Sequence, residues 1–115
     1  MYQFSYAEVL DDDPKDARSH ERRALEQAVD MLNAAQAKGS KSREAVEAVF
    51  FVRRLWTIFL EDLANNGNDL PQALRAQLIS IGLWITRELE AIRLGKSDNF
   101  AGIAQICAII RDGLK

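Results

Sequence analysis

Apolar residues recur along most of the chain at the three- and four-residue spacing of an α-helix. The first such segment follows Asp11–Asp13, which supplies an N-cap before Pro14, and runs to about Lys38, where Gly39 ends it. Its apolar positions are mainly alanines, with two leucines beside them: Ala17, Ala24, Leu25, Ala28, Met31, Leu32 and Ala35. Because these side chains are small, the pattern predicts a helix that another helix approaches closely.

A second helix is predicted to follow Ser40 or Ser42, either of which can cap it, and to end near Asn65. Between Ala45 and Leu60 this segment is apolar nearly all round. A helix that is apolar on every side either lies at the centre of its fold or is covered by a partner. The pattern leaves both interpretations open.

Two further helices complete the predicted elements. The loop 65–69 has an Asn- and Gly-rich turn composition, and the third helix runs from about Pro71 to Leu94, with Gly95 after it. The fourth helix is short, from Phe100 to about Asp112. Gly82 interrupts the third helix at a cost of about 1 kcal/mol relative to alanine, so we expect close backbone approach or a kink there.

These elements predict an all-α fold. Long helices joined by short turns stack antiparallel, which gives an up-down-up bundle of three long helices with a short fourth C-terminal helix. We expect one domain over residues 1–115, in which residues 1–12 form an N-terminal arm with alternating aromatic residues. A chain of 115 residues can bury a core without disulfides or metals.

Composition narrows the classes of function. The net charge of −2 argues against a dedicated nucleic-acid-binding protein, which usually carries a basic surplus. Cys107 is the single cysteine, so no internal disulfide is possible, and no apolar run is long enough for a membrane span. Nothing at the start of the chain resembles a secretory signal. We therefore expect a cytoplasmic protein, either a monomer or a homodimer.

The sequence contains no pattern of residues typical of catalysis. His20 lies among charged residues and is expected on a solvated face, and Cys107 lies on an apolar stripe without an activating histidine. Asp11–Asp13 is explained by capping and lacks the other ligands of a calcium loop. We expect no enzyme activity, no catalytic or metal site and no cofactor.

The surplus of apolar residues is the main functional signal. It predicts a surface that binds an amphipathic helix of a partner. The candidate partner-binding residues are Val52, Leu55, Trp56, Phe59, Leu63, Leu78, Trp84, Ile106 and Ile109. The alternative is an RNA-backbone contact through Lys38, Lys41, Arg43, Arg53 and Arg54. Glu44 and Glu47 lie among those charges, and we expect no aromatic stacking surface beside them.

Short motifs along nearly the whole chain carry a family resemblance. The central motifs are Leu55-Trp56-Thr57, Asp62-Leu63, Leu70-Pro71, Leu74-Arg75-Ala76 and Leu78-Ile79-Ser80-Ile81-Gly82. Tyr6-Ala7-Glu8-Val9 precedes them, and Ile109-Ile110 and Gly113-Leu114 follow. In this combination the chain resembles the FlaF family of alphaproteobacterial flagellar biosynthesis regulators.

The resemblance implies a role in flagellin synthesis and secretion, alongside FlbT, a post-transcriptional regulator of flagellin. Its most mechanistic form is an export chaperone that binds flagellin, whose amphipathic terminal helices must stay soluble before export. The alternative is a regulator that acts on flagellin mRNA or through FlbT. The resemblance brings no catalytic residues with it.

Overall fold

The computed structural model describes residues 14–114, which form four α-helices. These are α2 (Pro14–Lys38), α3 (Arg43–Ala64), α4 (Gln72–Arg93) and α5 (Phe100–Gly113). The predicted all-α fold, with three long helices and a shorter C-terminal one, is confirmed, and the helix ends agree closely with those read from the sequence. The predicted arm at 1–12 lies outside the described residues.

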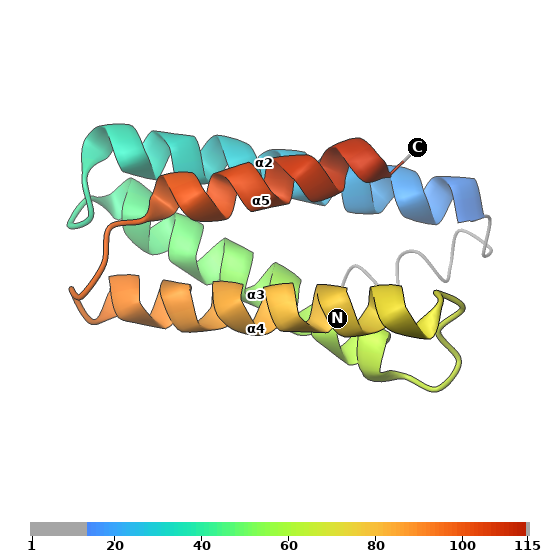
Figure 1. Cartoon of the computed structure of the whole chain (residues 1–115). Helices are drawn as coiled ribbons and strands as arrows, with labels where there is room; N and C mark the ends of the chain where they lie inside the picture. The colour runs from blue at the N-terminus through green and yellow to red at the C-terminus, as the bar shows by residue number, and fades with distance from the viewer. Residues whose placement is uncertain (1–13, 115) are drawn as a thin grey trace.

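Successive helices run antiparallel, as predicted (Figure 1). α5 lies along α2, α4 lies on the opposite side of the molecule, and α3 crosses obliquely between them. The closest backbone packing accordingly joins α2 to α5, α2 to α3, and α3 to α4. α3 is therefore the link between the α2–α5 pair and α4.

The buried residues form one apolar core. Alanines of α2 and α3, among them Ala28, Ala35 and Ala48, are fully buried, which allows the close approach predicted from the alanine stripe. Among the residues whose burial is described, no polar or charged side chain is buried. The largest fully buried side chains are Trp56, Phe100, Leu25, Leu32, Ile85, Leu89, Ile103, Val52 and Cys107. Each large apolar side chain contributes about 1.5–3 kcal/mol by leaving water.

The second helix is central in the fold, which is one of the two interpretations of its apolar pattern, and part of its apolar surface stays exposed among the described residues. Most large apolar residues of α3 are buried, as expected for a central helix. Val46 and Phe50 are each 66% exposed and lie outside that core. α3 therefore supplies the core and also leaves an apolar surface uncovered.

The turns around α3 are held by specific hydrogen bonds. Ser42 is the N-cap: its hydroxyl accepts from the Ala45 N–H at 3.1 Å and donates to the Gly39 carbonyl at 2.7 Å. Gly39 has φ = 101°, a left-handed conformation that favours glycine. After α3, the Arg75 guanidinium donates to the Leu63 carbonyl from Nε at 3.1 Å and from Nη2 at 2.9 Å. The start of α4 is thereby tied to the end of α3.

Gly82 lies at the close approach that its position in the sequence suggested. A Cβ atom there would stand 2.7 Å from Leu60 Cδ2 and 3.0 Å from Trp56 Cε3. The absence of a side chain on α4 at this point allows α3 and its tryptophan to pack against the α4 backbone.

We expect Gly82→Ala to lower the free energy of unfolding by about 1 kcal/mol. The gain in helix propensity, about 1 kcal/mol, is outweighed by an overpacking cost of about 1–3 kcal/mol. Urea unfolding followed by circular dichroism measures the difference. Gly113→Ala is the control, because a Cβ there meets nothing within 4 Å. A Gly82→Ala protein as stable as the wild type would show that the tryptophan contact does not require glycine.

An apolar groove as the candidate functional site

In Figure 1 the C-terminal half of α3 leaves the α2–α5 pair and approaches α4. Side chains from these helices and from the segment before α4 line an apolar groove with a volume of about 120 Å³. We call this the end groove. It is lined by Glu21, Leu25, Trp56, Phe59, Asp62, Leu63, Leu70, Leu78, Ile110 and Leu114.

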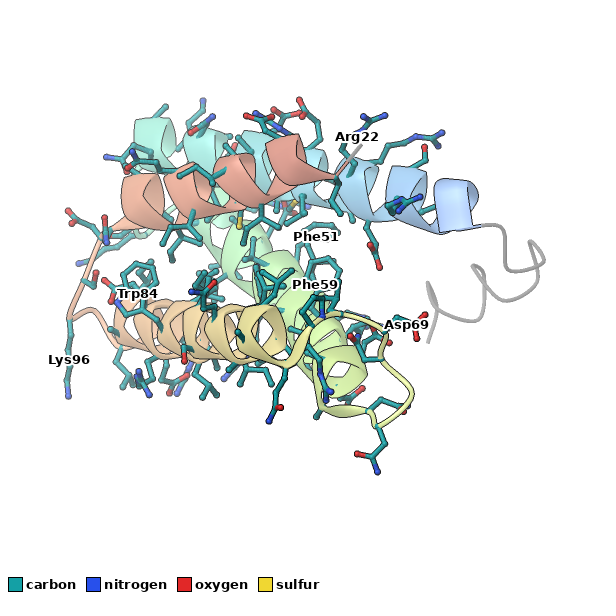
Figure 2. All side chains as sticks on the ribbon, turned by 45° about the vertical axis from the view of Figure 1, so that its right-hand side comes forward. Arg22, Phe51, Phe59, Asp69, Trp84 and Lys96 are labelled. Atoms are coloured by element: carbon teal, nitrogen blue, oxygen red, sulfur yellow. The ribbon has the colours of Figure 1, made fainter. Side chains whose placement is uncertain are left out.

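Two aromatic rings of α3 shape the end groove. Trp56 is only 1% exposed, and its ring meets that of Phe59 edge-on, with centroids 5.2 Å apart. Phe59 is half-buried and points into the space between α4 and the α2–α5 pair (Figure 2). Edge-to-face geometry is favourable for aromatic pairs, so the two rings support one another. The groove therefore has a rigid aromatic wall.

Two carboxylates accompany the apolar lining. Burial raises the pKa of Glu21 above its ordinary value of 4.5, the negative charge of Asp62 raises this pKa further, and Arg18 opposes both effects. Asp62 is exposed near the end of α3 and accepts a hydrogen bond from Asn68 Nδ2 at 3.3 Å. The groove therefore carries negative charge that Arg18 only partly offsets.

The structure brings four of the nine predicted partner-binding residues together in the end groove: Trp56, Phe59, Leu63 and Leu78. The others lie elsewhere. Val52 and Leu55 are buried in the core, and Trp84 and Ile106 are partly buried against it. Ile109 is 64% exposed on α5, outside the groove lining.

Sequence reasoning missed the groove residues that come from other segments. Leu70 precedes the proline that opens α4, and Ile110 and Leu114 stand at the end of α5. Glu21 lies four residues before Leu25 and so on the same face of α2. That spacing was the one available signal for Glu21.

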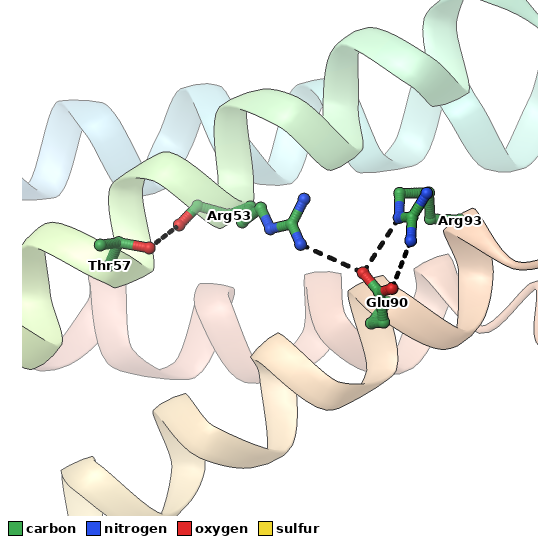
Figure 3. A network of polar contacts seen from close by, with 4 residues as sticks. All are labelled: Arg53, Thr57, Glu90 and Arg93. Atoms are coloured by element: carbon green, nitrogen blue, oxygen red, sulfur yellow. Dashed lines mark hydrogen bonds and ion pairs between the residues drawn. The ribbon is translucent and has the colours of Figure 1, made fainter.

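The residues proposed for RNA contact are exposed, but they are partly neutralised. Arg43 pairs with Glu47 at 3.2 Å. Arg53 Nη2 lies 3.1 Å from a Glu90 oxygen that also accepts from Arg93 Nε at 3.0 Å (Figure 3). Lys38, Lys41 and Arg54 are exposed as well.

One exposed aromatic ring lies beside two of those charges, although a single ring does not make the stacking surface whose absence we expected. Phe50, 66% exposed, lines a hollow together with Arg53 and Arg54. Phe50 belongs to the apolar run of the second helix, and the described structure leaves this side of α3 exposed.

Cys107 is a buried structural thiol, as predicted. It is fully buried in α5, and burial raises its pKa to about 11 although the nearby Trp56 indole partly opposes the rise. That contact falls short of a full hydrogen bond, since Trp56 Nε1 has no hydrogen-bond partner in the described structure.

The described residues contain no group of three histidine, cysteine, aspartate or glutamate side chains placed to hold a metal ion. None of the described helices is both long and apolar enough to span a membrane.

We expect the Cys107 thiol to react at least about a hundredfold more slowly in the folded protein than in the unfolded chain at pH 8. A rise in pKa from 9.0 to about 11 alone lowers the thiolate fraction by about that factor, and burial adds to it. Labelling with a chromogenic disulfide reagent, with and without denaturant, measures the ratio. Rapid labelling of the folded protein would mean that α5 readily opens.

The raised pKa of Glu21 gives a stability effect of known sign. The native state holds this proton more tightly than the unfolded chain, so the stabilisation is fully present below pH 4.5 and is lost as the pH rises through the native pKa. We expect Glu21→Gln to unfold at a higher urea concentration than the wild type at pH 7 and to lose this advantage toward pH 4. An equal difference at both pH values would exclude ionisation of Glu21 as the cause.

Comparison with known proteins places the chain in a family. The family model described as "Flagellar protein FlaF" matches residues 2–114. No curated protein and no solved structure matches the chain. The matched range includes every residue of the end groove and all four helices. The chain is therefore a member of the FlaF family of flagellar proteins, and its role lies in flagellum biosynthesis.

Proposed function

We propose that the end groove binds an amphipathic terminal helix of flagellin and keeps it soluble before export. The observation that carries this proposal is the groove itself, an apolar space that residues 14–114 leave open between helices and that Trp56 and Phe59 help to line. Apolar grooves between helices are a common way to receive an amphipathic helix. This function would place the protein in the cytoplasm, where flagellin is found before export.

The size of the end groove favours one large anchoring side chain. Its volume is about 120 Å³, and an apolar cavity of about 150 Å³ is known to bind benzene. A leucine or phenylalanine side chain of the cargo helix therefore fits between Phe59 and Leu78. The remaining apolar face of that helix would lie over Leu70 and Leu114, which line the same groove.

The charges of the groove favour a basic residue next to that anchor. Glu21 is partly buried, and both this burial and the negative charge of Asp62 disfavour its ionised form. A lysine or arginine of the cargo would relieve both effects, since opposite charges within a few ångströms favour the ionised carboxylate. We therefore propose a cargo helix that carries a cation beside its apolar stripe.

The alternative function, action on flagellin mRNA or through FlbT, has weaker support. Two of its five residues, Arg43 and Arg53, already form ion pairs with glutamates. The exposed ring of Phe50 beside Arg54 is the one feature that favours a nucleic acid, because exposed aromatic rings can stack on bases. A single ring is less than the series of rings that single-strand binding proteins use.

Calorimetric titration with the cognate flagellin tests the proposal. We expect binding with a negative heat-capacity change, from burial of apolar surface, and only moderate weakening at high salt. Leu78→Gln should weaken binding about tenfold, or about 1.4 kcal/mol, because it places an amide in the apolar wall.

Leu83→Gln is the matched control. It makes the same change on the same helix at a residue that is 46% exposed and outside the groove lining. Equal loss in both variants, or no binding to flagellin, would contradict the proposal. Steep weakening with salt, together with binding to flagellin mRNA, would favour the alternative.

A further inference from the structure

A second apolar surface projects from the N-terminal half of α3. Val46 and Phe50, one helical turn apart, are each 66% exposed, and Phe50 stands between two hollows of about 240 and 340 Å³. We call this surface the Phe50 projection: Val46 and Phe50, with Arg53, which lines both hollows, and Arg54, which lines one. Its central side chains are apolar and mostly exposed, whereas the end groove is an apolar hollow.

The rim of the Phe50 projection is basic. No carboxylate of residues 14–114 lines either hollow, and arginines line both. Figure 3 shows that Glu90 is shared between Arg53 and Arg93, which leaves these two guanidinium groups with one carboxylate between them. Glu47 is the nearest other acid in the sequence, and it is paired with Arg43. The rim therefore carries net positive charge.

The end groove and the Phe50 projection are complementary in shape and charge. The groove is apolar and carries Glu21 and Asp62, while the projection is apolar and carries arginines. The volume of the end groove, about 120 Å³, is of the order that accepts an aromatic ring. We propose that the Phe50 ring of one copy inserts into the end groove of a second copy, with Arg53 and Arg54 next to the carboxylates of that groove.

The positions of the two surfaces on α3 determine the kind of assembly. Phe50 and the groove residue Phe59 are nine residues apart, which is two and a half turns of helix, so their side chains point to opposite sides of α3 about 13.5 Å apart along its axis. In a twofold dimer each copy would have to present both its end groove and its Phe50 projection to the partner. Both surfaces would then have to lie on the same side of the protein. The contact is therefore head-to-tail. It cannot close as a twofold dimer, and it extends into open chains unless the rotation between copies closes a ring.

Self-association through this contact would occupy the groove assigned to flagellin. If the proposed function holds, one end groove cannot hold Phe50 of a second copy and flagellin at the same time. Added flagellin would therefore dissociate the self-associated protein. The self-association itself does not depend on that function, because both of its surfaces belong to this chain.

Sedimentation equilibrium from micromolar to submillimolar concentration tests the proposal. The average mass of the wild type should rise continuously with concentration, without a plateau at the dimer. Phe50→Ala removes the ring and Asp62→Lys reverses a groove charge, and each variant alone should associate at least about tenfold more weakly. Both residues are exposed or largely exposed, and a lysine near the end of α3 suits the helix dipole, so folding should be preserved.

An equimolar mixture of the two variants gives the sharpest result. The Phe50→Ala variant keeps an intact end groove, and the Asp62→Lys variant keeps an intact Phe50 projection. The projection of the second variant should bind the groove of the first, which gives a one-to-one complex that cannot grow further. Ile109→Ala, which removes a side chain of similar exposure on α5, is the control for general apolar adhesion and should associate like the wild type.

Three results would overturn the proposal: a wild type that stays monomeric, a mixture that stays monomeric, or Ile109→Ala as weak as Phe50→Ala. Binding of oligouridylate at Phe50 without self-association would assign the projection to RNA instead. Flagellin titration of Phe50→Ala separates this proposal from the proposed function, because that variant should still bind flagellin normally.

Discussion

The packing of Trp56 against the glycine of α4 is the contact on which the rest of the structure depends. A Cβ on Gly82 would lie only 3.0 Å from the Trp56 ring and 2.7 Å from Leu60 Cδ2, so these α3 side chains pack directly against the α4 backbone. The same indole lies close to the thiol of Cys107 in α5 and edge-on to Phe59. One side chain thus joins three helices and forms a wall of the end groove. A smaller residue would leave a cavity at that junction, and a larger one at position 82 would separate the helices.

The sequence predicts the helices well because their determinants are local. Apolar spacing, the Ser42 cap, the glycines after α2 and α4, and the proline before α4 each act over a few residues, and the structure confirms them. The close approach at Gly82 could also be inferred, since glycine within a long helix is costly without a packing reason.

The candidate site could be predicted only in part because it is assembled from segments far apart in the chain. The groove lining includes Glu21, Leu70 and Ile110, which lie close together only in the folded arrangement of the helices. Periodicity also could not rank the apolar residues of α3: Val52 is fully buried, whereas Phe50, two residues earlier, is mostly exposed. Residues two apart in a helix point about 200° apart, so Val52 and Phe50 lie on opposite sides of α3. Which of these sides is covered depends on how the four helices pack together, and the spacing within α3 alone does not show it.

The hydrogen bonds from Arg75 to the last turn of α3 have an entropic consequence for anything that enters the groove. They hold the α3–α4 connection by directional bonds to a backbone carbonyl, next to Leu63 and Leu70 of the groove lining. Such bonds preserve the separation of the two helix ends even when nothing fills the space between them. The groove is in this sense preorganised: an incoming side chain loses its own rotational freedom but does not have to order the wall it meets.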